Sequence, residues 1–576
     1  MIRLLPALLL LIVLPFVASP YVVTLANYIG ISALAALGLV LLTGVGGLTS
    51  FGQAAFVGIG AYATAVWSLQ GGSPWVGLLL AVALSGLVAA LLGLATLRLG
   101  GHLLPLSTIA WGLAIFFLFG NLETLGRHNG LSGIPPAASI LQSGRGGYVL
   151  VWTMVIAAIL LCGNLLDSRQ GRAIRGLRGG VAMAESLGIN TFRVKLAVFV
   201  LAGVLAGLSG WLYAHVQRFI SPTSFDVGPG MEYLFMAILG GAGHIVGAVL
   251  GAALVTISRD VLQDVLPYVM KDSGQAEAIV FGTLFILVMH RARGGLMPVL
   301  LRWFPERHPR LGEAAPLPRR SAPRAGQPLL EVADMAKRFG GLVAVNGVGF
   351  AVMAGEILGL IGPNGAGKST LFNLLSGTLP ADAGSVRFLG QDIAGLPARR
   401  IAALGIARSF QHIRLRPTMS LLDNVMLGAH LRGRSGWLRG ALRLNRAEET
   451  ALRAEALHQL RRVGLDAAPF GRAGELALGQ QRILEVARAL AADPVLIMLD
   501  EPAAGLRRAE KQALAALLRA LRDEGVTILL VEHDMEFVMS LVDRVVVMQF
   551  GRVLAAGTPA AIRADAAVQS AYLGDA

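Results

Sequence analysis

The sequence predicts two domains in different solvents: a multi-pass α-helical membrane domain, then a water-soluble α/β domain with a phosphate-binding loop. The chain has 576 residues, whereas a single domain typically has about 150. Hydrophobic residues make up 55% and charged residues only 15%, with a mean hydropathy of +0.65, and soluble proteins carry about 25% charged residues. These values exclude a disordered chain, a coiled coil and an ordinary cytosolic enzyme.

The distribution of charge divides the chain. Residues 1–290 contain 13 Lys and Arg against 9 Asp and Glu, and residues 331–576 contain 28 against 24. Residues 291–330 hold eight arginines, two acidic residues and several prolines, which is typical of an irregular linker. We therefore expect a membrane domain at 1–290, a basic Pro-rich linker at 291–328 and an α/β domain at 329–576.

The membrane domain contains about eight apolar runs long enough to cross ~30 Å of hydrocarbon. They lie near residues 4–18, 20–42, 54–70, 75–97, 103–121, 148–167, 196–217 and 276–290. The loop 168–195 carries six basic residues against Glu185 alone, which predicts that it is cytoplasmic. Counting crossings from it places both termini and the second domain in the cytoplasm. The first run is predicted to be a retained membrane helix, with a cleaved signal peptide as the alternative.

A further apolar stretch, 231–258, is interrupted by the glycine-rich residues 240–244. The predicted runs before and after this stretch already account for the crossings in this part of the chain. We therefore predict that the stretch enters the membrane and turns back to the same side. Such a break is stable only where it is buried in protein or lines a cavity, and it can mark a transport pathway. The alternative is that the glycines allow close helix packing. The same two interpretations apply to the glycines of residues 44–47.

The second domain contains the sequence GPNGAGKST at residues 362–370, between an apolar run and a helical pattern. This strand–loop–helix context is what a P-loop requires, because its backbone N–H groups surround phosphates at a helix N-terminus. Lys368 is expected to reach the β- and γ-phosphates, and Ser369 to ligate Mg²⁺. The expected nucleotide-binding residues of the loop are Gly362, Asn364, Gly365, Gly367, Lys368, Ser369 and Thr370.

Two further apolar strands end in chemically informative residues. Strand 495–499 is followed by Asp500 and Glu501. Asp500 is expected to hold Mg²⁺, and Glu501 to polarise the attacking water. Strand 527–531 leads to His533. Because the chain also contains the P-loop and the Asp500-Glu501 pair, His533 is expected to sense the γ-phosphate. These residues together predict hydrolysis of ATP.

The order of these motifs resembles that of the ATP-binding cassette (ABC) ATPases: the P-loop, Gln411, the sequence LALGQ at 476–480, Asp500-Glu501 and His533. The resemblance implies that Gln411 senses the metal and the membrane domain and that His533 is the switch histidine. It also implies ATP contacts from Leu478, Gly479, Gln480 and Phe339. Phe339 would stack on adenine; a core aromatic is the alternative.

A narrower resemblance is carried by KRFGGLVAVNGV, ARSFQHIRLRP and AAIRADAAVQSAYLGDA, which look like the ATPases of branched-chain amino acid importers. The first half resembles their permease subunits through GLTSFGQAAFVGIGAYATA, SRQGRAIRGLRGGVAMAESLGIN and YAHVQRFISPTSF. The chain therefore looks like a natural fusion of permease and ATPase. The implied function is ATP-driven import of branched-chain amino acids across the cytoplasmic (inner) membrane. Import of urea, short amides or small acids, an ABC exporter, and a membrane-anchored DNA-associated ATPase are the alternatives.

The resemblance also implies partners. Residues 182–188 would form the coupling helix that contacts an ATPase, although a generic cytoplasmic loop is the alternative. One chain supplies one P-loop and one signature, so a complete site requires a second permease and a second ATPase subunit, or self-dimerisation. An extracytoplasmic substrate-binding protein and membrane lipid are further partners, and nucleic acid is not. Ala477 stands where the signature normally has serine, which is expected to weaken the site that uses this signature.

Overall fold

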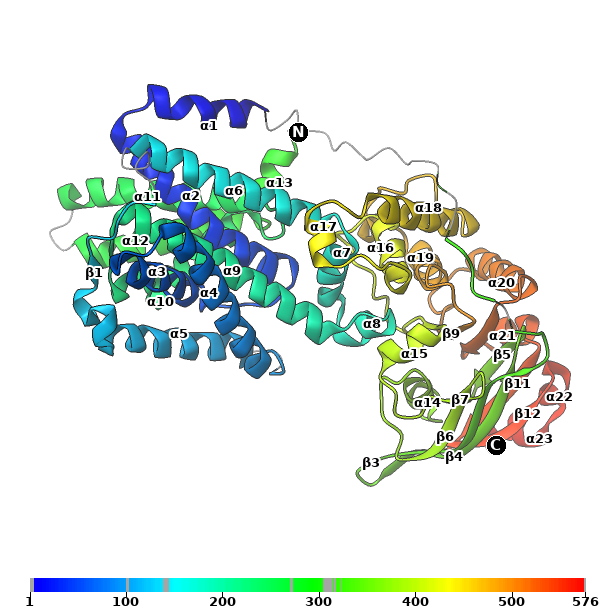
Figure 1. Ribbon diagram of the computed structural model, residues 1–576. Coiled ribbons are helices and arrows are strands. Elements are labelled where there is room, and N and C mark those ends of the chain that lie inside the picture. The colour runs from blue at the N-terminus through cyan, green and yellow to red at the C-terminus, as the bar shows by residue number, and fades with distance from the viewer. Residues whose placement is uncertain are drawn as a thin grey trace. The chain divides into compact units, whose positions relative to one another are not determined.

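A computed structural model describes residues 5–99, 103–137, 144–269, 273–303, 314, 317–321 and 323–573. The chain forms two compact units, and neither follows the sequence continuously (Figure 1). The helical unit comprises Met1–Leu166 and Phe192–Arg307, whereas the second unit comprises Asp167–Thr191 and His308–Ala576. The short segment 167–191, which connects two helices of the first unit, therefore packs with the α/β fold.

Each apolar run expected in the membrane domain coincides with a helix over the residues that the structure describes. The helices are α1 (Leu5–Val17), α2 (Pro20–Leu39), α3 (Gln53–Leu69), α4 (Pro74–Thr96), α5 (Leu103–Asn121), α6 (Gly144–Leu166), α9 (Thr191–Gln217), α10 (Val227–Gly241), α11 (Gly247–Val269), α12 (Ser273–Arg291) and α13 (Leu296–Leu301). Strands β1 (Leu131–Ser132) and β2 (Phe219–Ile220) form a small antiparallel pair. Pro20 and Pro74 begin α2 and α4, where a missing N–H costs nothing.

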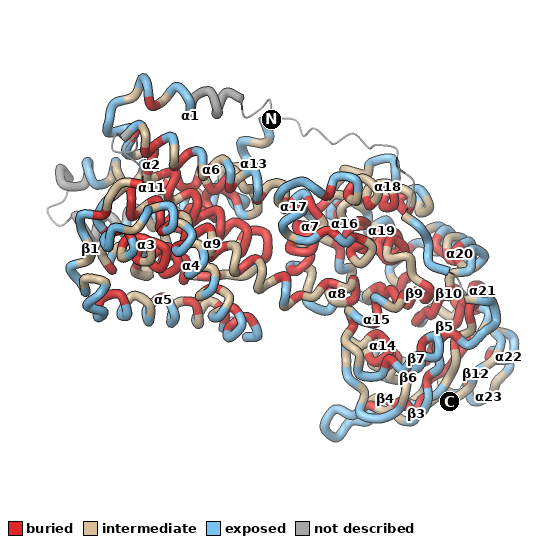
Figure 2. The backbone as a smooth tube through the Cα atoms, viewed as in Figure 1, coloured by how far each residue is buried: buried red, intermediate tan, exposed pale blue. Residues whose placement is uncertain are grey.

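Within the described residues, five helical segments are long and apolar enough to cross a membrane. They are Pro20–Val45, Pro74–Thr96, Leu103–Asn121, Arg145–Leu166 and Thr191–Gln217. The first of these includes a π-helical segment, Val40–Val45, that extends α2. Helices α1 and α3 have 13 and 17 residues, which is fewer than the about 20 residues of a full span. Leu79 and Leu106 are 69% and 62% exposed, and Figure 2 shows α4 and α5 with much exposed surface. Such surfaces suit contact with hydrocarbon.

The predicted interruption of 231–258 is present, because α10 ends at Gly241 and α11 begins at Gly247. The two helices approach so closely that a β-carbon on Gly240 would lie 1.8 Å from the carbonyl oxygen of Gly247. The other glycine-rich break lies against this one, since a β-carbon on Gly44 would lie 2.8 Å from the backbone nitrogen of Gly243. Close backbone packing therefore accounts for both breaks.

The α/β unit is built on a six-stranded sheet with the order β12-β11-β5-β10-β9-β8. The strands are β5 (Ile357–Ile361), β8 (Ile406–Arg408), β9 (Leu496–Asp500), β10 (Thr527–Val531), β11 (Arg544–Gln549) and β12 (Arg552–Gly557). All but β12 run parallel to their neighbours. Every residue of β5, β9 and β10 is buried, which explains their continuous apolar sequences.

A four-stranded antiparallel sheet and a group of helices complete this unit. The sheet has the order β4-β3-β6-β7, with β3 (Pro328–Phe339), β4 (Leu342–Met353), β6 (Ala383–Phe388) and β7 (Gln391–Asp392). The helices are α7 (Arg169–Gly176), α8 (Val181–Ser186), α14 (Lys368–Leu375), α15 (Ala398–Leu404), α16 (Leu421–Gly428), α17 (Trp437–Ala441), α18 (Arg446–Arg462), α19 (Leu478–Leu490), α20 (Arg508–Asp523), α21 (Met535–Leu541), α22 (Pro559–Ala564) and α23 (Ala566–Leu573). Separate apolar cores lie between the two sheets and within the α16–α18–α19 group.

Candidate functional site

The parallel sheet brings the predicted nucleotide-binding segments to one edge. The P-loop follows β5, His533 follows β10, Asp500 ends β9 and Gln411 follows β8. These four strands are successive neighbours in the sheet, and their carboxyl ends point the same way because they are parallel. Ligands of open α/β sheets bind at this edge.

The P-loop backbone leaves no room for side chains at two of its glycines. Gly362 and Gly367 have φ angles of 151° and 97°, which L-residues other than glycine adopt only with strain. A β-carbon on Gly362 would lie 2.1 Å from the carbonyl oxygen of Met548, and one on Gly367 would lie 2.2 Å from that of Ala344. The loop is thus held tightly between β4 and the end of β11.

Lys368 lies over this loop. Its Nζ donates to the carbonyl oxygens of Gly362 at 2.6 Å and Pro363 at 3.0 Å. Burial lowers the pKa of Lys368, while the charges of Glu501 and Asp500 raise it. Of the remaining P-loop residues expected to bind nucleotide, Asn364, Gly365 and Ser369 are exposed and Thr370 is half-buried. The loop therefore presents a buried cation beside accessible polar groups.

Asp500 is almost completely buried, with a side chain 4% exposed. Burial raises the pKa of this carboxyl, and neighbouring Arg408 lowers it. Its Oδ2 accepts from Arg408 Nη2 at 3.4 Å, whereas its buried Oδ1 has no hydrogen-bond partner in the part of the chain that the structure describes. Unpaired buried carboxylate oxygens are costly, so Asp500 Oδ1 fits a Mg²⁺ ion or a water bound to one.

Glu501, Gln411 and His533 come together at the same edge. Gln411 Nε2 donates to Glu501 Oε2 at 3.2 Å, and His533 Nδ1 lies 4.0 Å from the same oxygen. Glu501 has a φ of 49°, an uncommon conformation for a residue with a side chain. Its backbone N–H donates to Val531 at 2.8 Å, which attaches Glu501 to the end of β10. Three predicted catalytic residues therefore form one cluster.

The predicted signature residues lie elsewhere in the unit. These residues, Leu478, Gly479 and Gln480, begin α19. Helix α19 packs on α16 and α18, whereas α14, which follows the P-loop, packs on β4 and β9. Leu478 is 53% exposed and Gln480 is also exposed. A β-carbon on Gly479 would lie 2.7 Å from Glu510 Oε1. The signature thus forms a second group, in which Leu478 and Gln480 are exposed and Gly479 is buried.

Phe339 lies at the end of β3, beside the turn into β4. Its side chain is 47% exposed, which excludes a core position. Lys337 Nζ lies 5.8 Å from the centre of its ring, and Phe339 pairs with Leu342, two residues before Ala344 at the P-loop. An accessible aromatic ring near a P-loop is suited to stacking on a base.

Arg408 is a site residue that the sequence analysis missed. Its Nη1 donates to Asn373 Oδ1 at 2.8 Å and to Ser376 Oγ at 2.6 Å, both on or beside α14. Its guanidinium also reaches Asp500 and lies 5.0 Å from the ring of Phe410. The available signal was its position as the last residue of an apolar strand, directly before Ser409-Phe410-Gln411.

A second site is the docked segment, residues 167–191. Within it, α7 packs on α16 and α17, and its Arg172 reaches Glu449 on α18. Arg172 makes a bidentate ion pair with Glu449, with Nη1 2.7 Å from Oε2 and Nη2 3.1 Å from Oε1. The two side chains are only 4% and 6% exposed. Arg169 donates to the carbonyl oxygens of residues His430, Gly433 and Ser435. The sequence analysis did not single out α7, although its arginines recur at helical spacing.

The expected coupling helix, residues 182–188, overlaps α8. This helix lies against α15, and Glu185 Oε1 is 4.0 Å from Arg399. A β-carbon on Gly188 would lie 2.3 Å from Leu431, so the turn that ends α8 also packs closely on the α/β unit. The whole segment is therefore held by an ion pair, backbone hydrogen bonds and close packing.

Comparison with known proteins bears on both parts of the chain. Residues 21–289 match the family described as "branched-chain amino acid transport system / permease component". Residues 345–504 match that described as "ABC transporter". Residues 552–576 match that described as "branched-chain amino acid ATP-binding cassette transporter".

The second half is similar to high-affinity branched-chain amino acid transport ATP-binding proteins. The chain is 44% identical over 254 residues to BraF of Pseudomonas aeruginosa and to LivG of Escherichia coli K12. Each match covers 43% of this chain and 99% of the relative. A solved structure of a nucleotide-free ATP-binding cassette from an ABC transporter is 31% identical, with a TM-score of 0.39, and the match covers 43% of this chain and 100% of that one.

The fold and the site define a membrane transporter of the ABC class, with a helical permease part and an ATP-binding part in one chain. The chain belongs to the branched-chain amino acid ABC transporter family. Its ATPase part binds ATP and couples ATP hydrolysis to transport.

We expect Arg408→Met to impair the response to Mg²⁺ more than ATP binding itself. Asp500 Oδ2 loses its partner, so its carboxylate is no longer oriented toward the metal position. The thermal stabilisation produced by ATP with Mg²⁺ should fall toward that produced by ATP with EDTA, and half-maximal hydrolysis should need about tenfold more Mg²⁺. Arg387→Met, on the exposed surface of β6, is the control. An unchanged Mg²⁺ dependence would contradict this role.

We expect Arg172→Ala to destabilise the docked segment by about 3–5 kcal/mol, because it leaves the Glu449 carboxylate buried without its partner. The measurement is proteolysis of residues 167–191 together with thermal unfolding of the full chain in detergent. Arg172→Met combined with Glu449→Leu should recover most of the loss. If the single variant is as stable as Arg387→Ala, the pair does not hold the segment.

His430 should make stability depend on pH. Burial, with Arg169 and Arg172 nearby, lowers the pKa of His430 from 6.5 to about 3, so the unfolded chain binds the extra proton between these pH values. The free energy of unfolding therefore has its full value, as far as His430 is concerned, above pH 6.5, and it decreases as the pH falls below that value. Between pH 7 and pH 5 this loss is about 2 kcal/mol, or a midpoint drop of about 4–8 °C. His430→Gln should remove this part of the drop; an equal drop in both proteins would refute the assignment.

Proposed function

We propose that this chain is the permease–ATPase component of an importer for branched-chain amino acids in the cytoplasmic (inner) membrane. The observation that carries the proposal is the docked segment: residues joining membrane helices α6 and α9 pack inside the ATPase fold. Movement of the ATPase part is thereby passed to two membrane helices. The permease family match supports the substrate class, and urea, short amides and other small acids remain the alternative substrates.

In the proposed ATP site, the backbone of residues 362–367 surrounds the phosphates and Lys368 contacts the β- and γ-phosphates. Ser369, Gln411 and Asp500 would hold Mg²⁺, with Asp500 contributing its unpaired Oδ1. When bound, the ion neutralises charge that develops on the phosphate oxygens. Phe339 stacks on the adenine ring.

Glu501 polarises the attacking water. Gln411 orients its carboxylate by donating to Oε2, and His533 lies beside the same oxygen, where it can contact the γ-phosphate. Gln411 also belongs to the segment that connects β8 to α16, on which the docked α7 packs. The site and the docked segment are therefore linked through adjacent parts of the chain.

The exposed signature supports assembly with a second ATPase. Leu478, Gly479 and Gln480 form a group of their own, so in the proposed assembly they bind the nucleotide held by another P-loop. The partners are a second permease and a second ATPase subunit, or a second copy of this chain, together with an extracytoplasmic binding protein. Ala477 lacks the serine hydroxyl, which favours two unequal sites and hence a heteromeric pair.

The proposed topology has about eight crossings and a re-entrant 231–258 in the permease domain, 1–290. The basic linker at 291–328 leads to the ATPase domain at 329–576, and the ATPase domain and both termini lie in the cytoplasm. The positive loop 168–195 supports this orientation. The first helix is retained in the membrane; removal of a signal peptide is the alternative.

In proteoliposomes containing the full chain with its partner subunits, a leucine-loaded binding protein should stimulate ATP hydrolysis and leucine uptake. Glu501→Gln should lower hydrolysis by about 10²–10⁴-fold without weakening ATP binding. Glu331→Gln, on the exposed side of β3, is the matched control. Stimulation only by a binding protein loaded with urea or an amide would replace the proposed substrate, and a fully active Glu501→Gln variant would refute the assigned catalytic role.

A further inference from the structure

The ATPase unit carries a connection that is unusually basic and apolar. Residues 432–446, here called the basic loop, lead from α16 to the first residue of α18. They contain five arginines and no acidic residue. Three leucines and a tryptophan alternate with these arginines. Helix α17 forms its centre. Alternation of basic and apolar residues on one surface segment is typical of membrane-surface binding.

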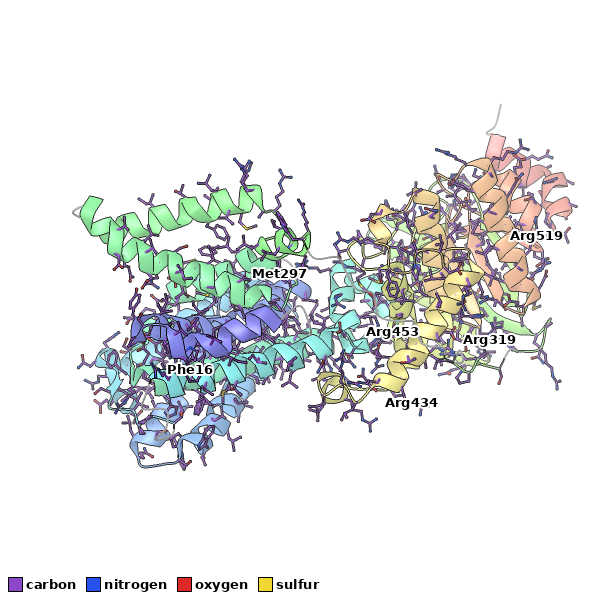
Figure 3. All side chains as sticks on the ribbon, turned by 90° about the horizontal axis from the view of Figure 1, so that it is seen from above. Phe16, Met297, Arg319, Arg434, Arg453 and Arg519 are labelled. Carbon is purple, nitrogen blue, oxygen red and sulfur yellow. The ribbon has the colours of Figure 1, made fainter. Side chains whose placement is uncertain are left out.

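The leucines of the basic loop face solvent in the folded chain. Leu438 is 73% exposed, Leu442 49% and Leu444 70%. Arg434, Arg439, Arg443 and Arg446 are exposed as well, and Figure 3 labels Arg434 at the surface of this unit. The small and polar residues Ser435, Gly440 and Asn445 are buried instead. The loop thus has an inner face fixed to the protein and an outer face that combines apolar and cationic side chains.

The inner face is fixed to the docked segment. Arg169 donates to the carbonyl oxygens of Gly433 at 2.6 Å and Ser435 at 3.0 Å, and α17 packs against α7 (Figure 1). These contacts are independent of the outer face, so the leucines are not needed to hold the loop in place.

The docked segment begins directly after the candidate membrane-spanning helix α6. The candidate span ends at Leu166, directly before Asp167 and three residues before Arg169. Three residues extend at most about 11 Å. The basic loop therefore packs on residues that lie within three positions of the end of the candidate span.

We propose that the basic loop is a lipid-contact surface of the ATPase domain. Its four exposed arginines bind anionic headgroups of the cytoplasmic leaflet, and Leu438, Leu442 and Leu444 enter the boundary between headgroups and acyl chains. The fifth arginine, Arg432, is paired with Glu455 at 3.1 Å. Charge complementarity and continuity with α6 favour lipid over a protein partner. This inference rests on the proposed cytoplasmic position of the ATPase domain, but it does not depend on which substrate is carried.

The first test measures the surroundings of the loop in the full chain. Leu438→Cys is made on a Cys162→Ala background, because Cys162 is the chain's one cysteine, and is labelled with an environment-sensitive NBD dye. Leu389→Cys, an exposed leucine (51%) after β6, is the matched control. Nanodiscs contain phosphatidylcholine alone or with one quarter phosphatidylglycerol, with and without brominated acyl chains.

Brominated lipid should quench the dye at 438 at least threefold more strongly than at 389, and phosphatidylglycerol should increase this difference. Equal quenching at both positions would overturn the proposal. It would also be overturned if the dye at 438 became shielded only when the second permease subunit was added, since the occupant would then be protein. Neither result depends on transport, so failure here is distinguishable from failure of the importer assignment.

The second test uses function. The combined Leu438→Ser and Leu444→Ser variant should hydrolyse ATP like the unaltered chain in phosphatidylcholine, because both side chains are exposed. It should lose at least half of any stimulation that phosphatidylglycerol gives the unaltered chain and the Leu389→Ser control. An identical response to phosphatidylglycerol in all three proteins would overturn the proposal. So would loss of activity in phosphatidylcholine, which would assign the leucines to the fold.

Discussion

The ion pair between Arg172 and Glu449 is the interaction on which the packing of residues 167–191 in the α/β unit depends. Both side chains are removed from water, and the desolvation cost of such a pair is recovered only with good geometry and further hydrogen bonds. The structure supplies both: two N–H donors of Arg172 meet the carboxylate, and the backbone N–H of Arg169 donates to Glu449 as well. A wrong register of the docked segment would leave a buried charge unpaired. The pair therefore specifies where the segment binds.

Electrostatics also organise the ATP site. Asp500 and Glu501 place two carboxylates side by side at the end of one strand, near Lys368. Arg408 binds one oxygen of Asp500 and leaves the other unpaired, while Gln411 and His533 lie on the Glu501 side. The two acids thereby acquire different surroundings, which is what separate roles in metal binding and water activation require.

The helical unit is stabilised by a different kind of contact. Lipid-facing helices gain little from apolar burial against one another, so close backbone approach becomes important. The pairs Gly240–Gly247 and Gly60–Gly207 have no space for a β-carbon on either helix. Some buried polar side chains are paired across helices, as in the contact of Thr64 on α3 with His215 on α9 at 2.9 Å. Tight glycine packing and such polar contacts therefore contribute to the helical unit what the hydrophobic effect contributes to the ATPase unit.

Local chemistry determined most of what the sequence predicted. The apolar runs became helices because the length and hydropathy of a run are properties of the run itself. The P-loop, Asp500 and His533 were recognisable because each lies at or just after the end of a buried strand. Other features depended on residues distant in sequence. Arg408 meets Asp500 across 92 positions and Arg172 meets Glu449 across 277, and no local pattern encodes such pairings. Only the tertiary structure decided that residues 167–191 fold with the ATPase unit, because the partners of their arginines come from a separate domain.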